Sequence, residues 1–438
     1  MKLGACGNIA SYQGEKRSGR KKAAGKTASA FPRETLHLSR KAAKGCGKRP
    51  ESRPELNGEL QSLPEKKWTV LLYAAANDDL ASDLLDNIRE IEDNAGSGPE
   101  INLLADRLAP PDYRPNDYGS KVISQFYYLE RQDEQTEASR VIARDDRIKV
   151  NSAAHLEKSL ALAMKKFPAC NYLIIMSGHG SGFPGLLRDR GDKSLLPLSA
   201  LQKALKNAEL QAGVDKKQVV LGFDACMMGE AEAAYEFKDV ANYYLASPSE
   251  TGVSGWPFHT IMREPRLPEF SQREMIDHII EENRDRICLT ETLSAFDQSR
   301  MPQVKEGMDQ LAGAILRDKP EKEPLRLALR AAEAYQRGSG VSEAYIDLGD
   351  FCRRISSSRK IKDQKVKQAA RNLGQVLQKT VVNEAHYAGK YPDATGISAY
   401  PAHQSDFVPE IYPNHDLYPN TAIGRDTRWG KAMDYLLS

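Results

Sequence analysis

The sequence predicts an α/β protein with a mostly parallel β-sheet flanked by helices, followed by a mainly helical C-terminal part. Between residues 67 and 300, apolar segments of strand composition alternate with segments of helical periodicity, which is typical of βαβ units and a parallel sheet. The strand segments are apolar at consecutive positions, as expected for a sheet that helices cover on both faces. Apolar residues make up 40% of the 438-residue chain, which suffices for a sizeable core.

The elements of the α/β part are predicted in order along the chain. A strand at 68–76 precedes a helix with leucine and isoleucine at helical spacing over 80–91, for which Asp78 or Asp79 is the expected N-cap. A second strand at 101–108 is followed by two segments that suggest a hairpin. The later elements are expected at 153–167 (helix), 171–177 (strand), 198–210 (helix, with Ser199 as N-cap), 217–224 (strand), 229–237 (helix) and 242–249 (strand).

Beyond about residue 292 the periodicity becomes mostly helical. The segment 395–402 (TGISAYPA) has strand composition instead, and we expect it to return to the edge of the sheet. The chain is thus divided into a leader (1–66), an α/β domain (67–300) and a helical region (301–438) with a strand near 395–402. Helices of the last part are expected within 304–318, 324–337, 347–355 and 365–382.

The leader carries the basic character of the chain. Residues 1–67 contain 16 Lys/Arg and 6 Asp/Glu, which gives them a net charge of +10. The remainder contains 46 Lys/Arg and 54 Asp/Glu, which gives it a net charge of −8. The leader is poor in large apolar residues and cannot bury enough surface to offset its ordering entropy, which predicts disorder. A basic tail can contact nucleic acid or anionic lipid, but a solvated linker explains the composition better, and we expect no nucleic-acid partner.

The stretch Leu3–Cys6 resembles the lipobox of bacterial lipoproteins, in which the cysteine receives the lipid. A signal peptide needs a basic and then an apolar region, and only Met1 and Lys2 precede this stretch. Either the start of the protein lies upstream, or the match is a coincidence. The expected location is extracytoplasmic, as a secreted, periplasmic or lipid-anchored protein, with membrane contact only if Cys6 is lipidated.

No apolar run approaches the roughly 20 residues of a membrane span. The six cysteines show no CxxC pair and no dense framework, which favours neither structural zinc nor a disulfide scaffold. No other ligand set has a recognisable metal-binding spacing, so the sequence predicts no metal site and no cofactor.

The stretch Gly180–Gly185 (GSGFPG) matches the letters of a dinucleotide-binding fingerprint. In that fingerprint the third glycine opens a helix, and an acidic residue follows about 20 residues later. Here Pro184 and a polar loop replace the helix, and position 205 is Leu. The sequence therefore argues against a nucleotide site.

Two reactive side chains follow neighbouring predicted strands. His179 stands between glycines after the strand at 171–177, and Cys226 ends the sequence GFDAC after the strand at 217–224. Open α/β sheets place ligands and chemistry at the carboxyl ends of their strands. A nearby histidine is the base that makes a thiol nucleophilic. The pattern predicts a catalytic pair, with the N–H groups of Gly180 and Cys226 as an oxyanion hole.

Four stretches resemble the clostripain family of cysteine peptidases, which belongs to the same caspase-like group as legumain and gingipain. The resemblance runs from about Lys67 to the C-terminus, and its His-Gly and Asp-Ala-Cys blocks are the most specific. It implies a caspase-like fold and a catalytic domain over 67–300. The stretches are KWTVLLYAAANDDL (67–80), YLIIMSGHGSGF (172–183), VVLGFDACMMGEAEAAYE (219–236) and ASPSETGVSGWPF (246–258).

The resemblance implies an endopeptidase that cleaves after arginine or lysine. His179 and Cys226 then form the catalytic dyad, and no third member is required. Asp224 matches the family's aspartate two residues before the cysteine, and a carboxylate in a partly dry pocket selects a guanidinium or ammonium group. The segment 246–256 is expected to form another wall of the cleft, with Glu250 as a second candidate to hold the basic P1 side chain.

The sequence departs at two places from the patterns of the clostripain family and of the caspases. The stretch NDDL (77–80) lacks the Asp-Asn order expected of the family, so no role is assigned to Asn77 or Asp78. Glycine follows Cys226 at plus three rather than plus two, which disfavours the caspases proper.

Family members can mature by cutting themselves between the histidine and the cysteine. The intervening loop offers Lys193, Arg190 and Arg188, in that order of preference, as cleavage points. Such a cut would convert a monomer into a two-chain enzyme.

Two alternatives remain open. One is a catalytically silent member of the same fold that only binds partners, against which the intact dyad argues. The other is a caspase-like cysteine hydrolase or transpeptidase with a different P1 preference. The expected partners are protein or peptide substrates with a basic P1 residue.

Overall fold

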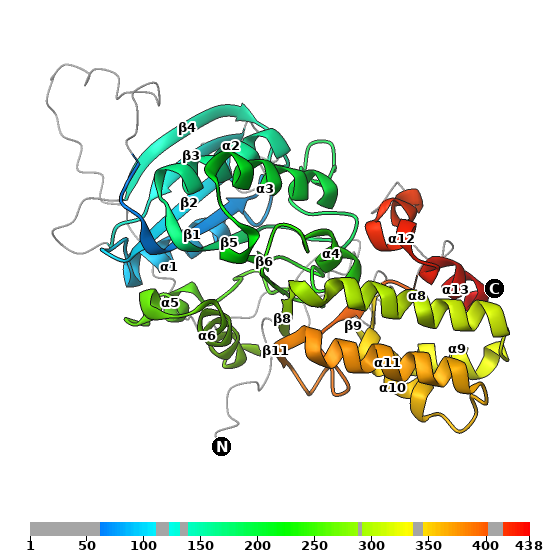
Figure 1. The fold of residues 1–438 in the computed structure, drawn as a ribbon. Coiled ribbons are helices and arrows are strands. Elements are labelled where there is room, and N and C mark those ends of the chain that lie inside the picture. Colours follow the sequence, from blue (N-terminus) through cyan, green and yellow to red (C-terminus); the bar gives the residue numbers. More distant parts are fainter. Residues whose placement is uncertain (1–61, 111–121, 132–138, 288–290, 336–344, 402–414) are drawn as a thin grey trace, which may run out of the picture. The chain divides into compact units, whose positions relative to one another are not determined.

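The fold is built on a nine-stranded β-sheet whose middle strands are parallel (Figure 1). The computed structural model describes residues 62–110, 122–131, 139–287, 291–335, 345–401 and 415–438. The strand order is β11-β8-β7-β6-β5-β1-β2-β3-β4; the stretch from β7 to β2 is parallel, and antiparallel pairs extend it at both edges. These strands are β1 (Lys66–Ala75), β2 (Ile101–Ala109), β3 (Val122–Tyr128), β4 (Arg140–Ile148), β5 (Ala169–Ser177), β6 (Val219–Asp224), β7 (Tyr243–Ala246), β8 (Thr292–Asp297) and β11 (Val381–His386).

Helices cover both faces of this sheet, because the side chains of each strand alternate between two hydrophobic cores. In β1, Leu71 and Tyr73 belong to the core that also holds α2, α3 and α4, whereas Val70 and Leu72 belong to the core of α1, α5 and α6. The predicted α/β fold is thereby confirmed. These helices are α1 (Ala81–Asn94), α2 (Ala153–Lys166), α3 (Leu198–Ala212), α4 (Ala231–Glu236), α5 (Phe258–Ile261) and α6 (Gln272–Arg284).

The residues after β8 add further helices and a small antiparallel sheet in the order β12-β10-β9. Side chains of α8, α10, α11 and α13 join the first of the two cores. The elements are α8 (Met301–Asp318), α9 (Lys322–Ala331), β9 (Ala334–Tyr335), β10 (Tyr345–Asp347), α10 (Leu348–Ser357), α11 (Gln364–Thr380), β12 (Ser398–Ala399), α12 (Ala422–Asp426) and α13 (Trp429–Leu437).

Several local predictions were wrong. The helix expected within 324–337 ends at Ala331, and Ala334–Tyr335 form strand β9. Helix α3 begins at Leu198, and its N-cap position is held by the extended backbone of Pro197 rather than by Ser199. The helix expected to reach residue 382 ends at Thr380, since the β-branched residues that follow continue as β11 beside β8. Because β11 occupies that edge of the large sheet, the strand predicted near 395–402 forms as β12 in the small sheet.

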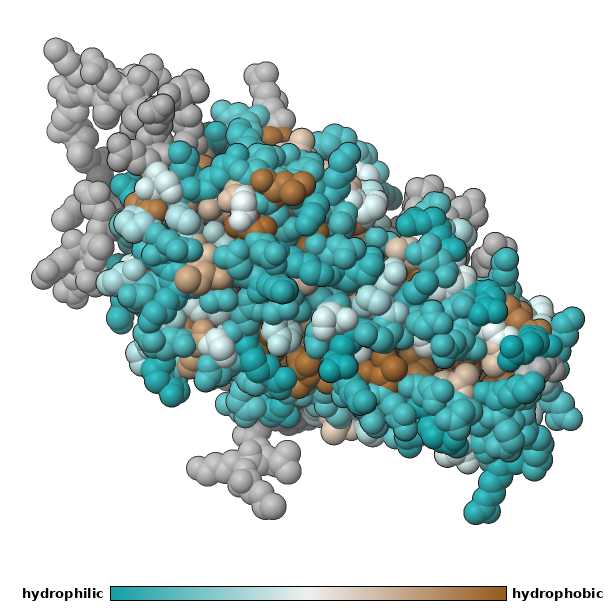
Figure 2. All heavy atoms as spheres, viewed as in Figure 1, coloured by the Kyte–Doolittle hydropathy of each residue, from teal (hydrophilic) through white to brown (hydrophobic). Residues whose placement is uncertain are grey.

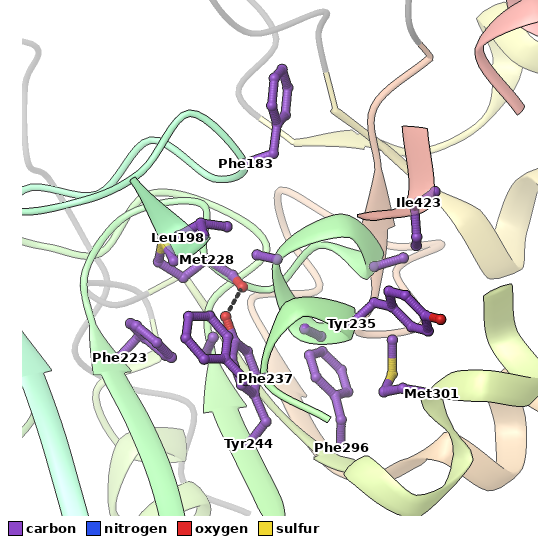
Figure 3. Close-up of a cluster of buried hydrophobic side chains, with 14 of the residues drawn as sticks. Phe183, Leu198, Phe223, Met228, Tyr235, Phe237, Tyr244, Phe296, Met301 and Ile423 are labelled. Carbon is purple, nitrogen blue, oxygen red and sulfur yellow. Dashed lines mark hydrogen bonds between the residues drawn. The ribbon is translucent and has the colours of Figure 1, made fainter. Parts of the chain in front are cut away.

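A buried aromatic cluster supports the turn that follows β6 (Figure 3). Phe223 on β6 packs against Phe237 and Tyr244, with ring centroids 5.5 and 4.9 Å away. The hydroxyl of Tyr244 donates a hydrogen bond of 2.7 Å to the carbonyl of Met228. The backbone that follows Cys226 is therefore fixed by its contacts with the hydrophobic core.

The face shown in Figure 2 is mostly hydrophilic. Among the residues that the structure describes, the exposed large hydrophobic side chains are Val141, Leu210, Val253 and Leu327. Within the same ranges, no helix combines the length and the apolar character needed to cross a bilayer.

Candidate active site

Three neighbouring parallel strands end in register at one edge of the sheet. Ala74 of β1 pairs with Ser177 of β5, which pairs with Asp224 of β6. Chemistry-bearing side chains follow each strand within three residues, as the placement of ligands at the carboxyl ends of open sheets leads one to expect. These side chains are Asp78 after β1, His179 after β5 and Cys226 after β6.

The imidazole of His179 lies against two carboxylates. Its Nε2 is 3.0 Å from Oδ2 of Asp78, whose side chain is fully buried, and 3.5 Å from Oδ1 of Asp79, whose side chain is 67% exposed. The contact with Asp78 is close but not aligned as a hydrogen bond, and it becomes an ion pair when the imidazole is protonated. Burial lowers the pKa of His179, but Asp78 outweighs it, and the net shift is upward.

Asp78 is the residue that sequence reasoning missed. It was expected only as a helix cap, whereas the N-cap position of α1 is Leu80, which lacks a side-chain cap. The backbone N–H of Leu80 donates to Oδ1 of Asp78 at 3.3 Å, which leaves Oδ2 for His179. Its position just past the end of a central strand was the available signal; that β1 lies beside β5 was not evident from the local sequence.

The thiol of Cys226 sits in a tight turn. The residue after it, Met227, has a φ of 61°, in the left-handed region that side chains rarely adopt. The turn is tied to the segment after β7, since Met227 N–H donates to Ser249 O and Gly229 N–H to Ser247 O, both at 2.8 Å. The N–H of Thr251 lies 3.4 Å from Sγ of Cys226.

The surroundings of Cys226 keep its sulfur protonated. Burial raises the pKa of the thiol to about 11, and the charges of Glu250 and Asp224 act in the same direction. A neutral thiol is a weak nucleophile, so its reaction requires a base that takes the proton.

Glycine is required at position 180. A Cβ there would lie 2.4 Å from the carbonyl oxygen and 3.1 Å from the backbone nitrogen of Cys226. Only a residue without a side chain lets the backbone after His179 approach the backbone of Cys226 so closely. The two residues predicted to supply oxyanion-hole N–H groups are thus neighbours in space.

A small pocket of about 90 Å³ opens beside the two predicted catalytic side chains. Asp224 lies in its wall, 4% exposed. The lining is formed by the ends of β5 and β6, the start of α1 and the predicted wall segment: Leu80, Leu84, Asn87, Ser177, Gly178, His179, Asp224, Ala225, Cys226, Thr251, Gly252, Val253 and Gly255.

The carboxylate of Asp224 is only half satisfied. Ser177 donates a hydrogen bond of 2.8 Å to Oδ2, whereas Oδ1 has no hydrogen-bond partner among the described residues, and neither has Nδ2 of Asn87 in the same pocket. Burial raises the pKa of Asp224 to about 6, against the opposing effects of Ser177 and of the backbone of Trp256. Gly255 (φ +63°) lets the backbone pack closely against the acid, because a Cβ there would lie 2.4 Å from Oδ2.

Glu250 occupies a different position. It is exposed and is not among the residues that line the pocket. Burial and the negative charge of Glu291 raise its pKa, and Lys390 opposes them. Asp224 is therefore the better placed of the two predicted substrate-binding acids.

The loop that holds the predicted cleavage points is anchored at both sides. The N–H of Leu187 donates to the carbonyl of His179 at 2.7 Å, and an isolated antiparallel β-bridge joins Leu186 to Leu196. Asn77 accepts a hydrogen bond of 3.0 Å from the backbone of Arg190. The tip is exposed and carries Lys193 with a φ of 59°.

Arg188 is exposed and its charge acts on both His179 and Asp78. Arg190 is half-buried. Cys6, the predicted lipidation residue, lies outside the described residues.

The fold and the site together place the chain among the cysteine peptidases of caspase-like fold. More particularly, the chain belongs to the clostripain family, whose model matches residues 72–418. It is 24% identical over 375 residues to clostripain of Hathewaya histolytica. The match covers 72% of this chain and 70% of the relative.

Solved structures of similar fold are also known. One is a secreted C11 cysteine protease from Bacteroides thetaiotaomicron called iotapain, at a TM-score of 0.63 and 15% identity over 83% of this chain and 99% of that one. Another is an inactive zymogen of a C11 protease from Parabacteroides distasonis, at a TM-score of 0.59 and 18% identity over 83% of this chain and 99% of that one.

Proposed function

We propose that this cysteine peptidase cleaves peptide bonds after arginine or lysine, with Cys226 as nucleophile and His179 as base. The observation that carries the specificity is the buried, half-satisfied carboxylate of Asp224 in the pocket beside Cys226. A cation that enters this pocket supplies the missing partner and returns the acid to its charged form.

In the first half of the reaction, His179 takes the proton of the Cys226 thiol while the sulfur attacks the carbonyl carbon of the scissile bond. The carboxylate of Asp78 beside Nε2 favours the neutral tautomer that carries its proton there, which leaves Nδ1 as the base. The N–H groups of Gly180 and Cys226 bind the oxyanion of the tetrahedral intermediate. The imidazolium then protonates the leaving amine, and the C–N bond breaks.

In the second half, water hydrolyses the thioester. His179 takes a proton from the water as its oxygen attacks the acyl carbon, and the resulting imidazolium returns the proton to the departing sulfur. Asp78 stabilises the imidazolium in both halves, since its charge raises the pKa of His179. Asp78 acts through His179 and is a positioning residue.

The Asp78→Asn variant is expected to lower kcat about 10- to 100-fold, the effect of losing one charge-assisted contact. Since Asp78 raises the pKa of His179, its loss lowers that pKa and moves the acidic limb of the kcat–pH profile to lower pH. A merely structural role would reduce activity without moving this limb. Asp79→Asn is the matched control and should change kcat less than about threefold, because that carboxylate is mostly exposed.

A panel of fluorogenic peptides with Arg, Lys, Asn or Asp at P1 tests the proposed specificity. We expect turnover of the Arg and Lys substrates and none of the Asp substrate. Turnover selective for Asn would contradict the role of Asp224 and indicate another P1 preference. A folded protein that turns over no member of the panel would instead favour a binding role.

We also propose that the enzyme cuts itself after Lys193. The exposed tip offers its peptide bond to solvent, whereas Arg188 and Arg190 lie in the anchored part of the loop. A related C11 protease is described as an inactive zymogen, which is consistent with maturation of this kind.

Self-cleavage predicts two chains on a denaturing gel, with Ser194 as the new N-terminus by Edman sequencing. Lys193→Ala should suppress this cut, whereas Lys203→Ala, which changes an exposed lysine of α3 outside the loop, should not. Cys226→Ala should remain a single chain. Equal cleavage of Cys226→Ala and the unchanged protein would show that another protease makes the cut.

We further propose an extracytoplasmic location and a monomer that becomes two associated chains after processing. The support for the location is that one relative of similar fold is described as secreted. Protein or peptide substrates with basic P1 residues are the proposed partners.

A further inference from the structure

Three possible metal ligands converge where β1 and β5 end. His179, Asp78 and Asp79 each offer one ligand atom, and these atoms lie within 4.8 Å of one another. The two carboxylate oxygens lie 3.0 and 3.5 Å from Nε2 of the imidazole. Ligands that surround a zinc ion tetrahedrally at about 2.0–2.2 Å are about 3.4 Å apart, a value that lies between these two distances.

A second observation points to a ligand at the same place. Oδ2 of Asp78 is fully buried, and apart from their contact with each other, neither it nor Nε2 of His179 has a partner among the described residues. The ring of His179, which one of these atoms belongs to, lines the active-site pocket. Asp79 is 67% exposed and His179 29% exposed, which gives an ion a route from solvent.

The donor set favours one class of cation. One imidazole nitrogen with two carboxylate oxygens suits zinc, whereas calcium and magnesium prefer ligand sets made entirely of oxygen. Three protein ligands leave a fourth position for water.

We propose that Asp78, Asp79 and His179 form a binding site for a divalent transition metal, with zinc as the best fit, and that the bound ion reversibly inhibits the enzyme. Coordination through Nε2 places the single proton of the neutral imidazole on Nδ1, so His179 can no longer accept the thiol proton there. The inhibitory consequence rests on the proposed role of His179, whereas the binding itself does not.

Zinc inhibition of peptide hydrolysis tests the proposal, with each variant compared with its own metal-free activity. We expect the inhibition constant to rise at least about tenfold in Asp79→Asn, as the loss of a ligand requires. Asp86→Asn is the matched control, because that aspartate is equally exposed, at 67%, and should leave zinc inhibition unchanged. Calcium at the same concentration should not inhibit.

Calorimetry of Zn²⁺ binding to Cys226→Ala separates this site from binding to the thiol and requires no activity. We expect zinc to bind this variant, and binding to weaken at least about tenfold when Asp79→Asn is added. Loss of zinc binding in Cys226→Ala, or equal zinc inhibition of Asp79→Asn and Asp86→Asn, would overturn the proposal. A failure of the proposed Arg/Lys specificity would leave the calorimetric result untouched.

Discussion

Replacing Cys226 with alanine is expected to lower kcat for peptide hydrolysis by at least about 10⁴-fold. The reaction proceeds through a thioester on this sulfur, and the remaining oxyanion-hole donors cannot replace the nucleophile. Cys170→Ala is the matched control, because it removes an exposed free thiol far from β6 in the sequence and should keep full activity. Steady-state kinetics with an Arg-P1 peptide, together with a thermal melt of each variant, provides the measurement.

The alanine variant should also retain its fold, since Cys226 is only partly buried and the turn is held by backbone hydrogen bonds to Ser247 and Ser249. An unchanged melting temperature with lost activity assigns the sulfur to the chemistry. Activity that persists in Cys226→Ala would contradict the mechanism.

The second large effect is expected from Asp224→Asn. We expect kcat/KM for Arg and Lys substrates to fall about 100-fold or more, since the cationic P1 group loses a buried counter-charge. The amide can still accept the hydrogen bond of Ser177, so the pocket keeps its shape. Substrates with a neutral P1 side chain should be hydrolysed at an unchanged or higher rate. Glu250→Gln is the control and should have a much smaller effect, because Glu250 does not line the pocket.

The pH dependence gives an independent test of Asp224. Its pKa is raised to about 6, so the free enzyme holds a charged carboxylate above that pH and a neutral one below it. The ratio of kcat/KM for a basic substrate to that for a neutral one should therefore fall as the pH decreases through about 6. The ratio removes the titration of His179, which affects both substrates. A ratio that stays constant with pH, or that falls equally in Asp224→Asn, would contradict the assignment.

The sequence predicted the central sheet well because each parallel strand is buried on both faces and reads as a continuous apolar run. The same reasoning placed His179 and Cys226 at one sheet edge, where the structure has both side chains in the lining of one pocket. The register of β5 with β6 explains this success, since Ser177 pairs with Asp224 two residues before each reactive side chain.

What the sequence could not show depends on pairings between distant segments. The contact of Asp78 with His179 exists because β1 lies beside β5, across about 100 residues of chain, and no local pattern encodes that order. The edge strand β11 was likewise hidden in a helical segment, since its pairing with β8 rather than its own propensity ends the helix.

In the proposed mechanism, Cys226 attacks substrates whose basic P1 group is held by Asp224. A peptidyl chloromethyl ketone with lysine at P1 alkylates the attacking sulfur, and peptide mapping by mass spectrometry locates the adduct. We expect one adduct per chain, on Cys226, that forms far more slowly in Asp224→Asn and not at all with an Asp-P1 reagent. An adduct on Cys170 instead, or equal labelling of Asp224→Asn and the unchanged protein, would contradict this account.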